Sequence, residues 1–182
     1  AEALGVPIDV LADKIVPDLG LDKNGEKVID YGSRTFTLSL MPDFTLSIYD
    51  NSKGKEVKSL PKPNADDDAA KAETAKKYLS DLKKQLKAVT ASQKTRLEDV
   101  FRNGRTWNTS DWNALFVENP VMHRFARNLI WGIYENKKLI STFRYTDDGT
   151  FCDMNDDEFE LPENAEISLV HPIELTDDAI EA

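Results

Sequence analysis

The sequence has little of what most catalytic sites are built from. Its 182 residues include one cysteine, Cys152, and two histidines, His123 and His171. One cysteine excludes an internal disulfide framework and a multi-cysteine zinc site, and two distant histidines do not supply the three ligands typical of catalytic zinc. The sequence contains no GxSxG, GxGxxG or GxxxxGK[ST] motif, so serine hydrolase, dinucleotide-binding and P-loop chemistry have no support. We therefore expect no catalytic constellation, no cofactor and no metal site.

Long apolar runs are also absent. No window approaches the roughly 18 consecutive apolar residues of a membrane span, so we expect no membrane partner. The chain begins Ala1-Glu2-Ala3, without an initiator methionine or a signal peptide, which we interpret as a segment of a longer polypeptide. A lone cysteine is compatible with a reducing compartment. We expect a cytoplasmic protein.

Hydrophobic periodicity predicts an α+β fold, because groups of strands are separated by helices rather than alternating with them. The N-terminal part (1–60) combines a short amphipathic helix at Pro7–Val16 with strands that alternate apolar and polar residues between Val28 and Tyr49. The middle part (61–129) is a proline-containing linker, a long basic helix and a helical corner. The last part (130–182) is an acidic lobe of strands. The three parts could form one compact domain.

Several element boundaries follow from local chemistry. Asp66, Asp67 and Asp68 suit the start of the long helix, and Gly104 suits its end. The β-branched patch Val89-Thr90 is its weakest point, where the sequence allows a kink or a break. The other boundaries are a cap at Thr109-Ser110, a helix start at Asn119-Pro120, a hairpin of Ile130–Glu135 and Lys138–Tyr145, short strands near Phe151 and Phe159, a last strand at Ile167–Val170, and a helix start at Thr176–Ala182.

The strongest candidate for an interaction surface is a group of arginine, tryptophan and histidine side chains near the end of the long helix. Arginine and tryptophan are enriched at binding hot spots, although a helical corner uses the same residues to lock its own packing, which we favour. The candidates are Arg102, Arg105, Trp107, Trp112, Arg124, Arg127, Trp131 and His171. For His123 and His171 individually, we favour structural hydrogen bonding and packing.

Two weaker candidates lie in the acidic C-terminal part. Asp153, Asn155 and Asp157 match the first oxygen ligands of a calcium loop, but Glu158 replaces the required glycine and Asn164 the bidentate glutamate. A solvated turn is the favoured interpretation. The Cys152 thiol has acidic neighbours, which raise rather than lower a thiol pKa, so a catalytic thiol is not favoured.

Short motifs along most of the chain resemble one bacterial family. They are Leu11-Ala12-Asp13-Lys14-Ile15-Val16-Pro17-Asp18-Leu19-Gly20, Asp30-Tyr31-Gly32-Ser33-Arg34, Leu60-Pro61-Lys62-Pro63, Arg96-Leu97-Glu98, Arg105-Thr106-Trp107, Arg127-Asn128-Leu129-Ile130-Trp131-Gly132 and His171-Pro172-Ile173-Glu174-Leu175. The chain resembles domain-of-unknown-function family 4132, found in large cytoplasmic proteins similar to the molybdate metabolism regulator and often carrying a WGR domain. The resemblance implies no settled activity. Thr106 and Asn119-Pro120 depart from the family's usual second Arg and His-Pro.

These observations favour a non-catalytic accessory or interaction segment of a larger bacterial protein, whose partners are other domains of that polypeptide or another protein. Nucleic-acid binding is the first alternative, because residues 71–105 hold ten basic and four acidic residues. It is not favoured, since the aromatic residues of a single-strand platform are absent from the helix. The second alternative is an enzyme fragment, with Arg105, Trp107 and His171 as contributors.

The formal net charge of −10 is unevenly distributed. Residues 145–182 carry thirteen acidic residues and no lysine or arginine, whereas residues 1–144 carry a net charge of +3. The acidic part could therefore pack against the basic helix of its own chain.

Overall fold

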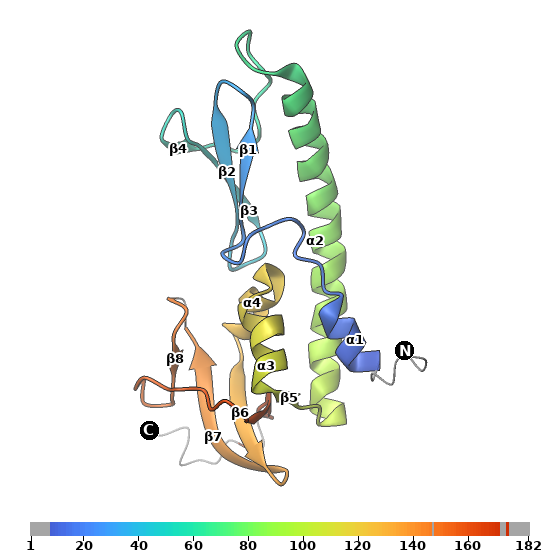
Figure 1. The fold of residues 1–182 in the computed structure, drawn as a ribbon, viewed down its shortest axis with the longest axis vertical. Helices are drawn as coiled ribbons and strands as arrows, with labels where there is room; N and C mark the ends of the chain where they lie inside the picture. Colours follow the sequence, from blue (N-terminus) through green and yellow to red (C-terminus); the bar gives the residue numbers. More distant parts are fainter. Residues whose placement is uncertain (1–7, 147, 172–173, 175–182) are drawn as a thin grey trace.

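Helix α2 (Ala69–Asn103) runs along most of the molecule, and two antiparallel sheets lie one beyond the other beside it (Figure 1). The computed structural model describes residues 8–146, 148–171 and 174. The arrangement confirms the predicted α+β class. At 1.5 Å per residue, the 35 residues of α2 span about 50 Å, which is why one helix can contribute to the cores under both sheets.

The ends of α2 follow the local chemistry of its sequence. The Asp68 carboxylate accepts hydrogen bonds from the backbone N–H groups of Ala70 and Lys71, and Gly104 ends the helix in the left-handed conformation (φ 58°). The helix continues through Val89-Thr90, so the break that the sequence allowed there does not occur. There the Thr90 hydroxyl donates to the Leu86 carbonyl at 2.7 Å, so it is satisfied within the helix.

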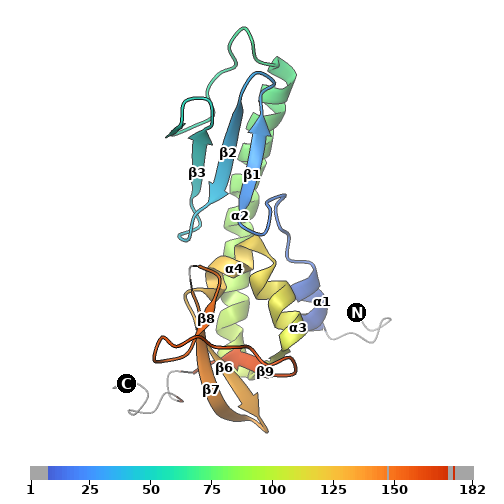
Figure 2. The same ribbon diagram turned by 60° about the vertical axis from the view of Figure 1, so that its left-hand side comes forward.

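The first sheet has the order β1-β2-β3-β4 and covers the N-terminal half of α2 with one face (Figure 2). Its strands are β1 (Glu26–Asp30), β2 (Thr35–Leu40), β3 (Leu46–Asp50) and β4 (Lys55–Glu56). Alternate residues of β2 point toward the helix, as the period-two pattern predicts. Phe36, Leu38 and Leu40 are buried against Leu82 and Leu86 of α2.

The second sheet has the order β5-β9-β6-β7-β8 and packs with the C-terminal third of α2. Its strands are β5 (Trp107–Asn108), β6 (Ile130–Glu135), β7 (Lys138–Tyr145), β8 (Phe151–Cys152) and β9 (Glu166–Leu169). The predicted β6–β7 hairpin is confirmed. Its turn residues Asn136 (φ 50°) and Lys137 (φ 64°) both adopt positive φ, as a tight hairpin turn requires.

Short helices follow β5 and lead to β6, both strands of the second sheet. They are α3 (Thr109–Trp112), one π-helical turn (Asn113–Val117) and α4 (Pro120–Ala126). Asn119 caps α4 and Pro120 begins it, as predicted. The predicted cap of α3 is wrong: Asn108 is the capping residue, and the Thr109 hydroxyl instead donates to the Pro162 carbonyl at 2.6 Å.

The acidic part of the chain contains fewer strands than the sequence suggests. Phe159 lies outside the named strands, and only the isolated pair Cys152 and Glu158 bridges here. The last strand is confirmed at Glu166–Leu169. The predicted helix start at Thr176–Ala182 lies outside the described residues. Among the helices that the structure describes, none is both long enough and apolar enough to cross a bilayer.

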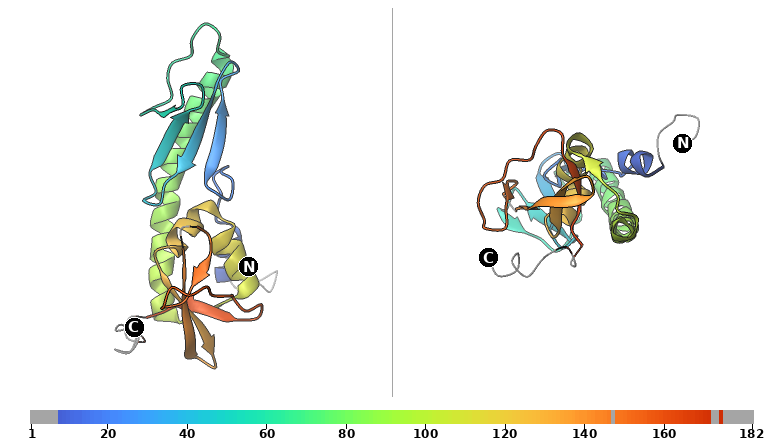
Figure 3. Two further views of the ribbon diagram at one scale, coloured as in Figure 1. Left: turned by 90° about the vertical axis from the view of Figure 1, so that its left-hand side faces the viewer. Right: turned by 90° about the horizontal axis from the view of Figure 1, so that it is seen from below.

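Helix α1 (Ile8–Lys14) lies at the periphery, beside α2 and α3 (Figure 3). An amphipathic helix usually turns its apolar side inward, and α1 does not. Ile8, the first residue of α1, and Ile15, which directly follows its last residue Lys14, are 72% and 69% exposed, and Leu11 between them is only partly buried. The side of α1 that meets the rest of the protein carries Asp13.

Candidate functional site

Asp13 is the centre of a dense polar cluster that joins distant parts of the chain. Its carboxylate accepts hydrogen bonds from Arg96 Nη2 (2.6 Å) and Trp107 Nε1 (2.9 Å). The two Nη atoms of Arg105 reach both carboxylate oxygens, so this pair is bidentate. We name Asp13, Arg96, Arg105 and Trp107 the Asp13 cluster. It joins α1, the C-terminal part of α2 and β5.

The cluster is largely shielded from solvent. The Asp13 side chain is 10% exposed and that of Arg105 is 17% exposed. The guanidinium group of Arg105 lies over the Trp107 ring, 4.7 Å from its centroid, and Arg96 Nη1 also donates to Gln93 Oε1 at 2.8 Å. The donors are therefore held in place by neighbours other than Asp13.

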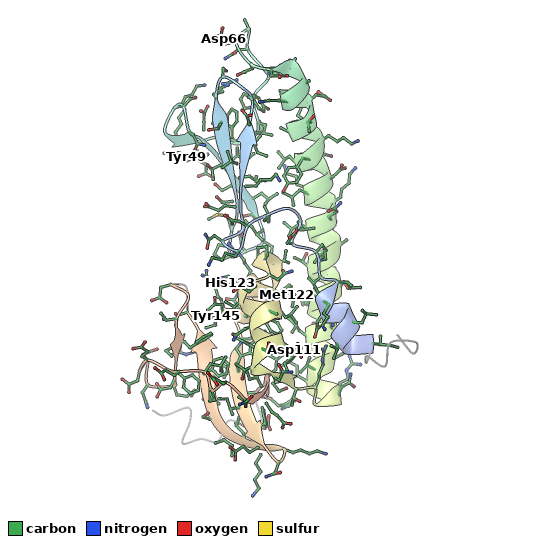
Figure 4. The ribbon with its side chains drawn as sticks, viewed as in Figure 1. Tyr49, Asp66, Asp111, Met122, His123 and Tyr145 are labelled. Carbon is green, nitrogen blue, oxygen red and sulfur yellow. The ribbon has the colours of Figure 1, made fainter. Side chains whose placement is uncertain are left out.

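A cavity of about 290 Å³ opens beside the cluster, between α1 and the α3 segment. Figure 4 shows Asp111 on α3 next to α1, and Asp111 is among the residues that line this cavity. Val10, Leu115 and Asn119 line other parts of its wall. Asn119 Nδ2 also donates to the Val16 carbonyl at 3.0 Å, which fixes the chain just after α1.

The three tryptophans predicted as interaction candidates belong to one aromatic core. Trp112 and Trp131 are fully buried, with ring centroids 5.2 Å apart in an edge-to-face arrangement. Trp107 packs edge-on against Trp131 and Phe116. Trp131 Nε1 donates to the Ala126 carbonyl at 3.0 Å. Of the three indole N–H groups, that of Trp107 reaches the Asp13 cluster.

The four arginines predicted as interaction candidates lie in different surroundings in the structure. Arg105 belongs to the Asp13 cluster, whereas Arg102 is exposed on α2 and pairs with Asp99 at 3.5 Å. Arg124 on α4 is buried, and its Nη2 donates to the carbonyls of Asn24 and Leu40, which belong to the first-sheet region. The guanidinium of Arg127 lies 5.9 Å from the Tyr145 ring centroid.

His171 lies in a second cavity, of about 390 Å³, at the C-terminal end of α2. Its ring packs edge-on against Phe101, with centroids 5.7 Å apart. In the same cavity the Tyr134 hydroxyl donates to Glu174 Oε2 at 2.9 Å, and burial together with this carboxylate raises the pKa of Tyr134 well above its usual range. Arg105 and Trp107 point to Asp13 instead, so the structure does not join the three residues suggested for an enzyme fragment into one site.

The acidic loop at Asp153–Asp157 is a hydrogen-bonded turn. The Asp153 side chain accepts from the backbone N–H groups of Asn155 and Asp157, and Asp156 pairs with Arg144. Within the described ranges, no group of three His, Cys, Asp or Glu side chains is placed to hold a metal ion.

Four basic residues of α2 and of the segment just after it form ion pairs with acidic residues that lie close to them in space. Lys71 pairs with Asp30 at 2.6 Å, Arg102 with Asp99, and Arg96 and Arg105 with Asp13. These ion pairs run to residues before position 100 rather than to the acidic segment after residue 145. The remaining lysines of the helix have exposed side chains and lie on its solvent side: Lys76, Lys77, Lys83, Lys84, Lys87 and Lys94.

The sequence analysis missed Asp13 and Arg96 as site residues. Their partners lie 83 to 94 positions apart in the chain, so no local spacing reveals the contact. A usable signal was present, because the family-like motifs around Asp13, Arg96 and Arg105-Thr106-Trp107 meet in this one cluster.

Comparison with known proteins identifies the family of this chain but indicates no activity for it. Residues 54–182 match the family model described as "Domain of unknown function (DUF4132)". The chain is 37% identical over 179 residues to the Escherichia coli (strain K12) protein named "Uncharacterized protein YehI". That alignment covers 97% of this chain but 15% of the E. coli protein, so the chain spans a small part of that relative's length. No solved structure gives a significant match.

Proposed function

We propose that this chain, which belongs to the family of domain of unknown function DUF4132, is a non-catalytic accessory segment of a longer bacterial polypeptide, to which it offers an interaction surface. The partner is another part of the same polypeptide, in the cytoplasm. We also propose that the longer polypeptide is similar to the molybdate metabolism regulator and carries a WGR domain outside this chain. The small share of the E. coli relative that the chain covers supports the proposal that the chain is a segment of a longer polypeptide.

The observation that carries the proposal is the outward-facing apolar stripe of α1. This stripe consists of Ile8, the first residue of α1, and Ile15, which directly follows its last residue, and both expose about 70% of their surfaces. Fully burying an isoleucine is favourable by about 1.5–3 kcal/mol. A second surface that covered both side chains would therefore bind with a favourable free energy of a few kcal/mol from their burial. In the isolated chain both side chains stay exposed to water.

A binding experiment tests the proposal. The chain is mixed with the remainder of the longer polypeptide, expressed separately, and their association is measured by calorimetry. The double variant Ile8→Ser/Ile15→Ser should weaken association by at least about tenfold, the equivalent of roughly 1.4 kcal/mol. Ile140→Ser is the matched control, because Ile140 is also an exposed isoleucine but lies on β7. Equal affinity of the double variant and the unmodified chain would rule the stripe out as the interface.

Nucleic-acid binding through residues 71–105 remains the second choice. Two of the arginines in that range are engaged with Asp13, and Lys71 is engaged with Asp30. If the exposed lysines nevertheless bound DNA, the affinity would fall steeply with salt, with a logarithmic slope of about −0.9 per neutralised phosphate.

A further inference from the structure

The donors around Asp13 have the geometry of a binding site for an oxyanion. Arg105 presents two N–H groups to the two carboxylate oxygens, and Arg96 and Trp107 add one hydrogen bond each, at 2.6 and 2.9 Å. Bidentate arginine pairs of this kind recognise carboxylate and phosphate groups in general, because the planar fork matches two oxygens at once.

The donor side of the site is built independently of α1. Trp107 is 5% exposed and packs against Phe116 and Trp131 in the core under the second sheet. Arg105 stacks on Trp107, and Arg96 is oriented by Gln93. Removing Asp13 would therefore leave the three donors close to their present positions.

The acceptor side is weakly held by comparison. Helix α1 has seven residues, a length that is marginal for an isolated helix. None of its described side chains is fully buried, and Ile8 faces solvent. Its described polar contacts to α2 are those of Asp13 and a long hydrogen bond of 3.5 Å from Arg96 to the Ala12 carbonyl. The next fixed point along the chain is the Val16 carbonyl, bound by Asn119.

We propose that Arg96, Arg105 and Trp107 form an oxyanion-binding site that Asp13 occupies in this structure, and that an external carboxylate or phosphate group competes with Asp13 and releases α1. This inference goes beyond the interaction surface proposed above, since it assigns a ligand class to the inward-facing side of α1 and to the donors that Asp13 contacts there. Because Asp13 competes from within the chain, an external anion binds the unmodified protein more weakly than it binds a protein lacking this carboxylate.

The indole N–H resonance of Trp107 is a direct reporter, since this group donates to Asp13. The experiment titrates acetate in one arm and inorganic phosphate in the other against the unmodified chain and Asp13→Ala. In Asp13→Ala, either anion should move the Trp107 resonance saturably back toward its position in the unmodified chain, at concentrations on the order of millimolar. The arm with the tighter midpoint identifies the preferred ligand. Trp112 and Trp131 are internal controls, because their indoles do not contact Asp13.

Variants at the arginines separate a specific site from a general ion effect. In the Asp13→Ala background, Arg105→Gln should weaken anion binding roughly tenfold to a hundredfold, as expected for losing a bidentate charged pair. Arg102→Gln, at an exposed arginine in the last turn of α2, should leave anion binding unchanged.

Four results would overturn the proposal. They are no saturable shift in Asp13→Ala, an equal shift of all three indole resonances, an unchanged midpoint on adding Arg105→Gln, and failure of both Asp13→Ala and Asp13→Asn to fold. The last result would mean that Asp13 is needed for folding and cannot exchange with a ligand.

Discussion

Arg124 should couple the two halves of the molecule, and its replacement by methionine tests this directly. The residue lies on α4, beside the second sheet, and is 7% exposed. Its Nη2 atom donates to the Asn24 carbonyl at 2.7 Å and to the Leu40 carbonyl at 2.8 Å, both in the first-sheet region. Burial, with a smaller contribution from Arg127, lowers the pKa of Arg124, although an arginine stays protonated near neutral pH.

The expected magnitude follows from these two contacts. A hydrogen bond from a charged donor contributes about 1.5–3 kcal/mol, so the two together contribute about 3–6 kcal/mol. Methionine fills similar space and recovers part of the cost of burying a charge, but it leaves the Leu40 carbonyl without its donor. We expect Arg124→Met to lower the free energy of unfolding by about 2–4 kcal/mol. At a urea dependence of about 2 kcal/mol/M, the midpoint should fall by roughly 1–2 M.

Two optical signals should report the loss of coupling. All three tryptophans lie in the core under the second sheet, so tryptophan fluorescence follows that core, whereas far-ultraviolet circular dichroism is dominated by α2. In Arg124→Met the first-sheet region should unfold at lower urea, so the circular dichroism transition begins before the fluorescence transition. Arg102→Met, at a 77% exposed side chain, should change stability by less than about 0.5 kcal/mol. Coincident transitions at the unmodified midpoint would refute the reasoning.

Three further outcomes are expected. Gly132→Ala should lower the free energy of unfolding by about 1–3 kcal/mol in urea titrations, because an added Cβ would lie 2.5 Å from a Leu139 methyl group. Lys137→Gly should raise the thermal midpoint, since glycine relieves about 0.5–1 kcal/mol at a position with φ 64°. Asp67→Asn should destabilise the protein at pH 7, because Arg34 holds the pKa of Asp67 at about 2, below its unfolded value. That contribution is full above about pH 5 and lost as the pH falls through 2, so the stability difference measured across an acid titration should shrink to nothing near pH 2.

The elements that could be predicted are those whose determinants are local. The alternation in β2 places Phe36 and Leu38 toward the helix, and the Asn119-Pro120 pair both caps and begins α4. The β6–β7 hairpin follows from two residues, Asn136 and Lys137, between alternating segments. In each case the residues that decide the structure are neighbours in sequence, so a window of a few residues contains the necessary information.

The parts that could not be predicted depend on distant contacts. The cap of α3 falls on Asn108 because the Thr109 hydroxyl is used by Pro162, which lies 53 positions away. Likewise, the role of Arg124 depends on two carbonyl groups that lie 84 and 100 positions earlier. No periodicity carries such information, because it arises only when the chain has folded.

Helix α1 shows how a polar cluster can offset an apolar pattern. Turning its stripe inward would bury Ile8 and Ile15, a gain of about 1–2 kcal/mol each for the surface they now expose. It would also turn Asp13 toward solvent and leave Arg96, Arg105 and Trp107 without their shared acceptor. Removing one partner from a buried charged cluster costs about 3–5 kcal/mol. Because the side chains here are 10–27% exposed, we reduce this cost to about 2–4 kcal/mol. The polar and the apolar contributions are therefore of similar size, and the observed orientation obtains both once a second surface covers the isoleucines. The proposed interaction would therefore bury the isoleucines without turning Asp13 away from its donors.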